Sequence, residues 1–158
     1  MKILYFMARR TLYSYSYLTQ IGATTIGLTQ SQLFKTIPFD VKAVNALSTA
    51  AREHGYLLYP IDNPEIYRDL VNNHVFPEEI LAPDIDWVGR MRLDDADPVR
   101  RLLAHSHQLN VDSWFVYGDV DLSHHSAFAE RQFLSKHCNN INRDLADKIS
   151  SYITTKSH

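Results

Sequence analysis

The stretch DVKAVNALSTAAREHGYLLYPI, residues 40–61, carries a helix pattern followed directly by a strand pattern. Asp40 is of a type that caps helices, and an apolar stripe follows it at helical spacing. The stripe consists of Val41, Val44, Leu47 and Ala51. Gly55 stands where a left-handed residue commonly ends a helix, and residues 56–61 form a short apolar run. The stretch predicts a helix from Asp40 to about His54 and then a strand.

Helix and strand patterns alternate on both sides of this stretch. Further strands are predicted at residues 2–8, 86–93 and 111–117, and further helices at residues 63–74, 97–109, 124–138 and 141–153. Such alternation predicts an α/β fold in which a mixed, partly parallel sheet is flanked by helices. Residues 11–37 do not follow the alternation, so an α+β fold with an antiparallel addition to the sheet is the alternative. Within them, residues 12–18 (LYSYSYL) alternate with a period of two, which predicts a strand, although a helical stripe also fits.

Length and composition predict one soluble globular domain over residues 1–158, of which 45% are apolar. The net charge of −2 argues against nucleic acid as a partner, because nucleic-acid binders ordinarily carry a basic excess. No window approaches the roughly 20 apolar residues of a membrane span, and no secretory signal is expected. The single cysteine, Cys138, cannot form an internal disulfide, which fits a reducing compartment. We therefore expect a cytoplasmic protein with no membrane partner.

A nearly uncharged segment near the amino end is the first candidate for function. Residues 11–39 hold one charged residue, Lys35, among many Tyr, Ser and Thr residues. In a strand, Tyr13, Tyr15 and Tyr17 would share one face. Tyrosine is enriched at protein contacts because it buries a large area and still forms hydrogen bonds. Residues 11–30 therefore predict a contact surface for another protein or for a second copy of the chain, without a cofactor.

Acidic and histidine side chains follow the predicted strand 111–117. Asp119 and Asp121 could share a divalent cation, and His124 or His125 could move a proton. The Asp-Val-Asp element resembles the Asp-x-Asp element of nucleotide-sugar glycosyltransferases, and this resemblance implies acids that hold a metal ion on a diphosphate. His105 and His107 are different, because residues two apart on a helix lie about 200° apart. We expect these two to be surface histidines on opposite flanks of the helix 97–109.

Two arginines follow the first predicted strand. If strands 2–8 and 111–117 are parallel neighbours, Arg9 or Arg10 lies at the same sheet edge as Asp119 and can bind a phosphate. The chain has no glycine-rich phosphate loop. The leading hypothesis is protein–protein contact through residues 11–30. The alternative is a metal-assisted transferase or hydrolase that acts on a phosphorylated or nucleotide-type substrate at the end of strand 111–117.

Overall fold

The computed structural model describes residues 1–87 and 97–156. Its sheet consists of β1 (Lys2–Phe6), β2 (Leu57–Pro60), β3 (Ser113–Tyr117) and β4 (Gln132–Phe133). The strands lie in the order β2-β1-β3-β4, and each pair of neighbours among them is parallel. The α/β prediction is confirmed, and the described residues 11–37 add no antiparallel strand.

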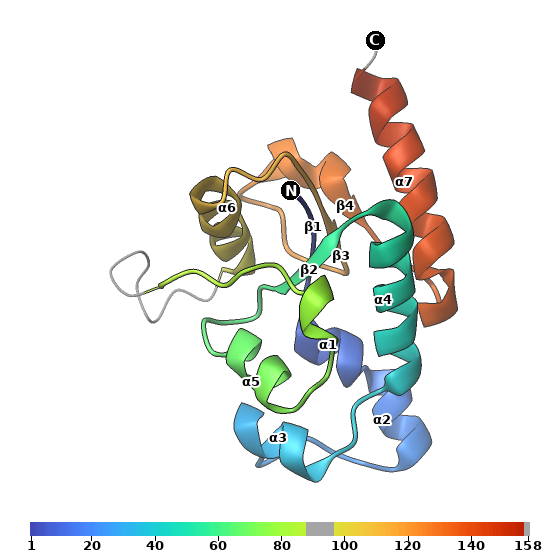
Figure 1. Cartoon of the computed structure of the whole chain (residues 1–158). Coiled ribbons are helices and arrows are strands. Elements are labelled where there is room, and N and C mark those ends of the chain that lie inside the picture. The colour runs from blue at the N-terminus through green and yellow to red at the C-terminus, as the bar shows by residue number, and fades with distance from the viewer. Residues whose placement is uncertain (88–96, 157–158) are drawn as a thin grey trace.

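Helices cover both faces of the sheet (Figure 1). The α-helices are α1 (Ala8–Leu12), α2 (Tyr15–Ile21), α3 (Gln30–Thr36), α4 (Val41–His54), α5 (Ile66–Asn72), α6 (Pro98–Gln108) and α7 (Ile141–Lys156). The described residues also form the short 3₁₀ turns η1 (Glu78–Ile80), η2 (Ser126–Arg131) and η3 (Cys138–Asn140). Helices α4 and α7 lie side by side on one face, and α6 lies on the opposite face. Among the described residues, no helix is both long and apolar enough to cross a membrane.

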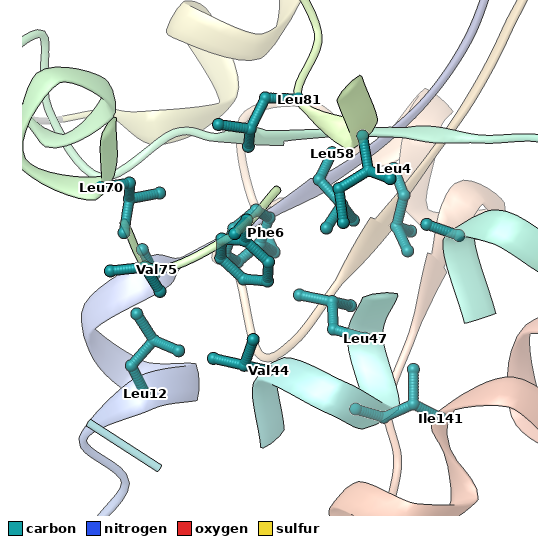
Figure 2. Close-up of a cluster of buried hydrophobic side chains, with 14 of the residues drawn as sticks. Leu4, Phe6, Leu12, Val44, Leu47, Leu58, Leu70, Val75, Leu81 and Ile141 are labelled. Carbon is teal, nitrogen blue, oxygen red and sulfur yellow. The ribbon is translucent and has the colours of Figure 1, made fainter. Parts of the chain in front are cut away.

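The central strand β1 supplies side chains to two apolar clusters. Leu4 and Phe6 point to the α4 and α7 side, where they meet Val44, Leu47 and Ile141 (Figure 2). The alternate residues Ile3 and Tyr5 point to the α6 side and pack with Val99 and Leu102. Because side chains alternate along a strand, a buried strand needs apolar residues at every position. The run ILYF after Lys2 meets that need.

The predicted helix 40–54 forms as α4. The Asp40 carboxylate accepts hydrogen bonds from the amides of Lys42 and Ala43, and Gly55 ends the helix at a left-handed φ of 74°. Most of the predicted stripe is buried, but Val41 in the first turn is 58% exposed. Asp97 caps α6 in the same way, through the Val99 amide. These caps fix the ends of the two helices because they satisfy amides that have no partner within the helix.

Two predicted elements are wrong. Residues 12–18 form no strand: α1 ends at Leu12, and Ser14 begins α2 by accepting a hydrogen bond from the Tyr17 amide. Residues 124–138 form no long helix, and instead contain η2 and then β4. Of the predicted strand 86–93, residues 86–87 are not in a strand, and residues 88–93 lie outside the described part of the chain.

His105 is completely buried, so its prediction as a surface histidine is wrong. The Tyr5 hydroxyl donates to Nδ1 over 2.9 Å, and Nε2 donates to the carbonyl of Pro83 over 2.8 Å. The imidazole stacks on the ring of Tyr59, with 3.7 Å between centroids. Since a carbonyl oxygen can only accept, Nε2 carries a proton, and in the neutral ring Nδ1 is then the acceptor for the Tyr5 hydroxyl. Burial lowers the pKa of His105, against the raising effects of the Pro83 bond and of Asp84. His107 is exposed, as expected.

Candidate functional site

The strand order creates a switch point between β1 and β3. After β1, the chain forms β2 as one neighbour of β1 in the sheet. It later returns to form β3, which is the neighbour of β1 on the other side. In open α/β sheets, ligands bind outside the carboxyl ends of strands at such a point. Phe6 and Tyr117, the last residues of β1 and β3, are register partners. β1 and β3 are therefore parallel neighbours. The prediction that Arg9 or Arg10 lies at the same sheet edge as Asp119 depends on this pairing.

A pocket of about 450 Å³ lies at this point, and we call it the switch-point pocket. Its walls come from the segments that follow β1, β3 and β4 and from the first turn of α4. Three cationic side chains line it: Arg10 after β1, Lys42 in α4 and Lys136 after β4. Asp40 and Asp119 also line it, so among the described residues the fixed cations outnumber the carboxylates by three to two. The pocket therefore suits an anionic ligand that also carries hydrogen-bond donors.

Arg10 lies in α1, directly after β1, and its side chain extends to the end of β3. Its Nη1 donates to the backbone carbonyl of Asp119 over 2.6 Å. A guanidinium has five N–H donors in a planar fork, and this bond uses one of them. Arg10 lines the switch-point pocket and also a neighbouring hollow of about 390 Å³, whereas Arg9 lines only the latter. Of the two predicted arginines, the structure therefore places only Arg10 at the switch point.

Asp62, which sequence reasoning missed, fixes the start of the helix that carries Arg10. Its carboxylate accepts hydrogen bonds from the amides of Ala8 and Arg9, over 2.7 and 3.0 Å. Burial raises the pKa of Asp62, and these two amide bonds act in the opposite direction. The Arg101 guanidinium donates to the Asp62 carbonyl over 3.0 Å. An aspartate placed shortly after a strand was the available signal, because such a residue can cap a helix that follows the neighbouring strand.

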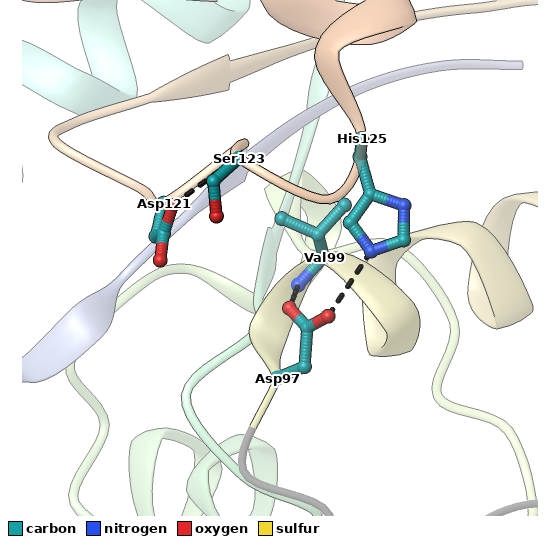
Figure 3. A network of polar contacts seen from close by, with 5 residues as sticks. All are labelled: Asp97, Val99, Asp121, Ser123 and His125. Atoms are coloured by element: carbon teal, nitrogen blue, oxygen red, sulfur yellow. Dashed lines mark hydrogen bonds and ion pairs between the residues drawn. The ribbon is translucent and has the colours of Figure 1, made fainter.

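The four predicted acidic and histidine residues are not brought together. Asp119 lines the pocket, but Asp121 is exposed and accepts a hydrogen bond from the Ser123 amide, which lowers its pKa (Figure 3). His125 turns instead to Asp97, with 3.1 Å between Nε2 and Oδ2, and His124 is exposed. Within residues 1–87 and 97–156, no three His, Cys, Asp or Glu side chains are grouped to hold a metal ion. Among the described residues, Asp119 and Asp121 thus belong to no group of three such side chains.

The three tyrosines do not share one surface, because their segment is helical. Tyr13 is buried, and its hydroxyl donates to the carbonyl of Ile37. Tyr17 is half-buried, donates to the carbonyl of Pro38 and lines the switch-point pocket. Tyr15 is 87% exposed. Of the three tyrosines, only Tyr15 is therefore exposed enough to contribute to a contact surface.

The pocket contains further residues that sequence reasoning did not select. Lys42, Lys136 and Cys138 come from segments far apart in the chain. The sequence pattern predicts a helix over Lys136 and Cys138, so it gives no sign that these residues follow a strand. Lys42 follows the cap residue Asp40, and nothing in its local sequence marks it as a pocket residue.

The chain matches no known family model, no curated protein and no solved structure. No function can therefore be carried over from a relative. The chemistry of the switch-point pocket and of the surrounding surface is the basis for inferring what the protein does.

Proposed function

We propose that this protein binds a small phosphorylated molecule in the switch-point pocket. The supporting observation is that Arg10, Lys42 and Lys136, from three separate elements, line one pocket at the carboxyl ends of β1, β3 and β4. A phosphate carries up to two negative charges and several acceptor oxygens, which suit a planar guanidinium fork and two ammonium groups. A volume of about 450 Å³ is in the usual range for small-molecule sites.

The carboxylates of the pocket favour a ligand with hydroxyl groups beside its phosphate. A carboxylate accepts hydrogen bonds and repels a second anion. Asp119 is exposed at the end of β3, while Oδ1 of Asp40 already accepts two amide bonds in α4. The alternative hypothesis from the sequence is a metal-assisted enzyme for a phosphorylated substrate. We retain the phosphorylated ligand, and we assign the binding of its phosphate to cationic side chains instead of a metal ion. We also propose a cytoplasmic location, where Cys138 would remain a free thiol.

Replacing Arg10 by alanine should weaken the binding of a phosphorylated ligand by roughly 10- to 100-fold, because a hydrogen bond to a charged group contributes about 1.5–3 kcal/mol. Isothermal titration calorimetry with ribose 5-phosphate and with AMP measures this loss. Arg68→Ala is the matched control, since Arg68 is exposed on α5 and is not among the residues that line the pocket. Absence of binding to both compounds, or an equal loss in the control, would show the proposal to be wrong.

A second candidate function is self-association through the α2 segment. Tyr15, Ile21 and Ile26 are 87%, 42% and 88% exposed, and residues 11–30 contain no charged side chain. Three exposed apolar side chains within twelve residues of an uncharged segment offer apolar area to a second copy of the chain. This observation supports the contact hypothesis, now centred on Tyr15 instead of on a row of three tyrosines.

Sedimentation velocity over a range of concentrations tests the second candidate. The wild-type chain should show a dimer at high concentration, and the double variant Tyr15→Ser/Ile26→Ser should shift the dimer dissociation constant upward by about 10-fold or more. The control is Ile153→Ser, because Ile153 is 59% exposed on α7. A wild-type chain that stays monomeric at all concentrations would contradict self-association.

A further inference from the structure

Another hollow adjoins the switch-point pocket along helix α4. It has a volume of about 770 Å³ and shares Lys42, His137 and Cys138 with the pocket. We call this hollow the amide groove. Three shared residues make the groove and the pocket neighbouring parts of one cleft. A ligand whose phosphate lies in the switch-point pocket can therefore extend past Lys42 into the groove.

One wall of the amide groove is a single stripe of α4. Lys42, Asn45, Ala46 and Thr49 follow the spacing i, i+3, i+4, i+7, which places them on one face of the helix. From Lys42 to Thr49 the helix rises about 10 Å. The groove is thus long enough for one or two sugar rings placed end to end.

The rest of the lining is the segment from His137 to Asn142, which packs beside α4 and contains three asparagines. Asn139 is exposed and Asn140 is half-buried. Asn142 is already engaged, because its Nδ2 donates to Glu53 over 2.5 Å and its Oδ1 lies 2.8 Å from Nε2 of His54. Those contacts hold the Asn142 side chain in one orientation. Asn45, Asn139 and Asn140 therefore provide the amides for a ligand.

The chemistry of this lining selects a hydroxylated partner. A side-chain amide has one acceptor oxygen and two N–H donors, so it can pair with a hydroxyl group in either direction. The described lining holds one fixed charge, Lys42, and no carboxylate. Its apolar members are Ala46 and Cys138, which give little surface for a flat base or an acyl chain. A polyhydroxylated group fits this lining better than either of them.

We propose that the ligand is a sugar phosphate whose phosphate lies in the switch-point pocket and whose sugar lies along the amide groove. This inference depends on the phosphate site proposed above. The phosphate contacts Arg10 and Lys136, and Lys42 stands at the junction of the two parts. Asn45 of α4 and Asn139 of η3 contact the hydroxyl groups. The groove thereby determines which phosphorylated compound binds, while the pocket supplies the charge.

Calorimetric titration with inorganic phosphate, glucose 1-phosphate, maltose 1-phosphate and AMP tests this inference. The wild-type chain should bind maltose 1-phosphate at least 10-fold more tightly than inorganic phosphate and more tightly than AMP. Asn45→Ala and Asn139→Ala should each weaken maltose 1-phosphate by about 5-fold, which corresponds to about 1 kcal/mol for a neutral hydrogen bond. Both variants should bind inorganic phosphate as the wild type does. Both residues are exposed, so circular dichroism should show an unchanged fold.

Asn72→Ala is the matched control, because Asn72 is exposed at the end of α5 and is not a groove residue. It should leave all four affinities unchanged. Equal affinity for phosphate and maltose 1-phosphate, tighter binding of AMP, or insensitivity to both groove variants would overturn the sugar assignment and leave the phosphate site intact. Failure of all four compounds to bind would instead refute the phosphate site itself.

Discussion

Replacing Phe6 by alanine is expected to lower the free energy of unfolding by about 3–5 kcal/mol, the usual cost of removing a buried aromatic ring. Phe6 is completely buried at the end of the central strand β1, among Leu47, Leu70 and Val75 (Figure 2). Its ring meets Phe76 edge to face, with 5.6 Å between centroids. Because typical domains are stable by about 5–15 kcal/mol, this one change should remove a large part of the total.

Urea denaturation followed by circular dichroism measures the loss. Ile26→Ala is the control, since Ile26 is 88% exposed and its truncation should change stability by less than about 0.5 kcal/mol. If Phe6→Ala were folded too little to analyse, Phe6→Leu should still unfold at a clearly lower urea concentration than Ile26→Ala. Equal midpoints for the Phe6 and Ile26 variants would contradict the assignment of Phe6 to the core.

Acidification should destabilise the fold through His105, because burial penalises the charged imidazolium more than the Pro83 bond and Asp84 favour it. The pKa of His105 is lowered in the folded state, while an unfolded histidine titrates near 6.5. Between these two values the unfolded chain binds more protons, so the His105 contribution is complete above about pH 6.5. It is lost as the pH falls from there through the folded-state pKa. Protonation at Nδ1 would also remove the acceptor for the Tyr5 hydroxyl.

Unfolding free energies of the wild type and of His105→Gln, measured from pH 8 to pH 4.5, test this expectation. Their difference should shrink as the pH falls, since glutamine does not titrate. The raised pKa of Asp62 has the opposite pH dependence, but it is present in both chains and cancels in the difference. His107→Gln, at an exposed position on the same helix, should follow the wild-type curve. A difference that stays constant with pH would refute the role of His105.

Elements with strong local signals could be predicted from the sequence. Asp40 and Gly55 mark the two ends of α4 by cap chemistry that depends on neighbouring residues alone. Residues 12–18 were predicted wrongly because their alternation fits both periods, and tertiary contacts decided between them. Tyr13 packs edge to face with Phe34 and bonds to Ile37, and these contacts require the turn between α1 and α2. Such partners cannot be identified from spacing.

The place of the candidate site at the carboxyl ends of the strands could be predicted from the sequence. Most of the residues that line it could not. Parallel pairing of β1 with β3 brought Arg10 to the backbone of Asp119, as the condition on neighbouring strands implied. His125 could not be placed, because its partner Asp97 lies 28 residues away in sequence. His105 was misplaced for a similar reason, since a polar residue enters a core only when partners such as Tyr5 and Pro83 satisfy both of its nitrogens.

The two edge strands of the described sheet leave few unpaired backbone groups with which another strand could pair. At one side, β4 pairs with β3 through only two residues. At the other side, Leu81 bridges to Leu58, and the Ala82 amide donates to the Leu58 carbonyl over 2.8 Å. Unpaired strand edges are the templates on which cross-β fibrils grow. With one edge strand only two residues long and the other bridged at Leu58, the folded chain should resist fibril formation even when concentrated.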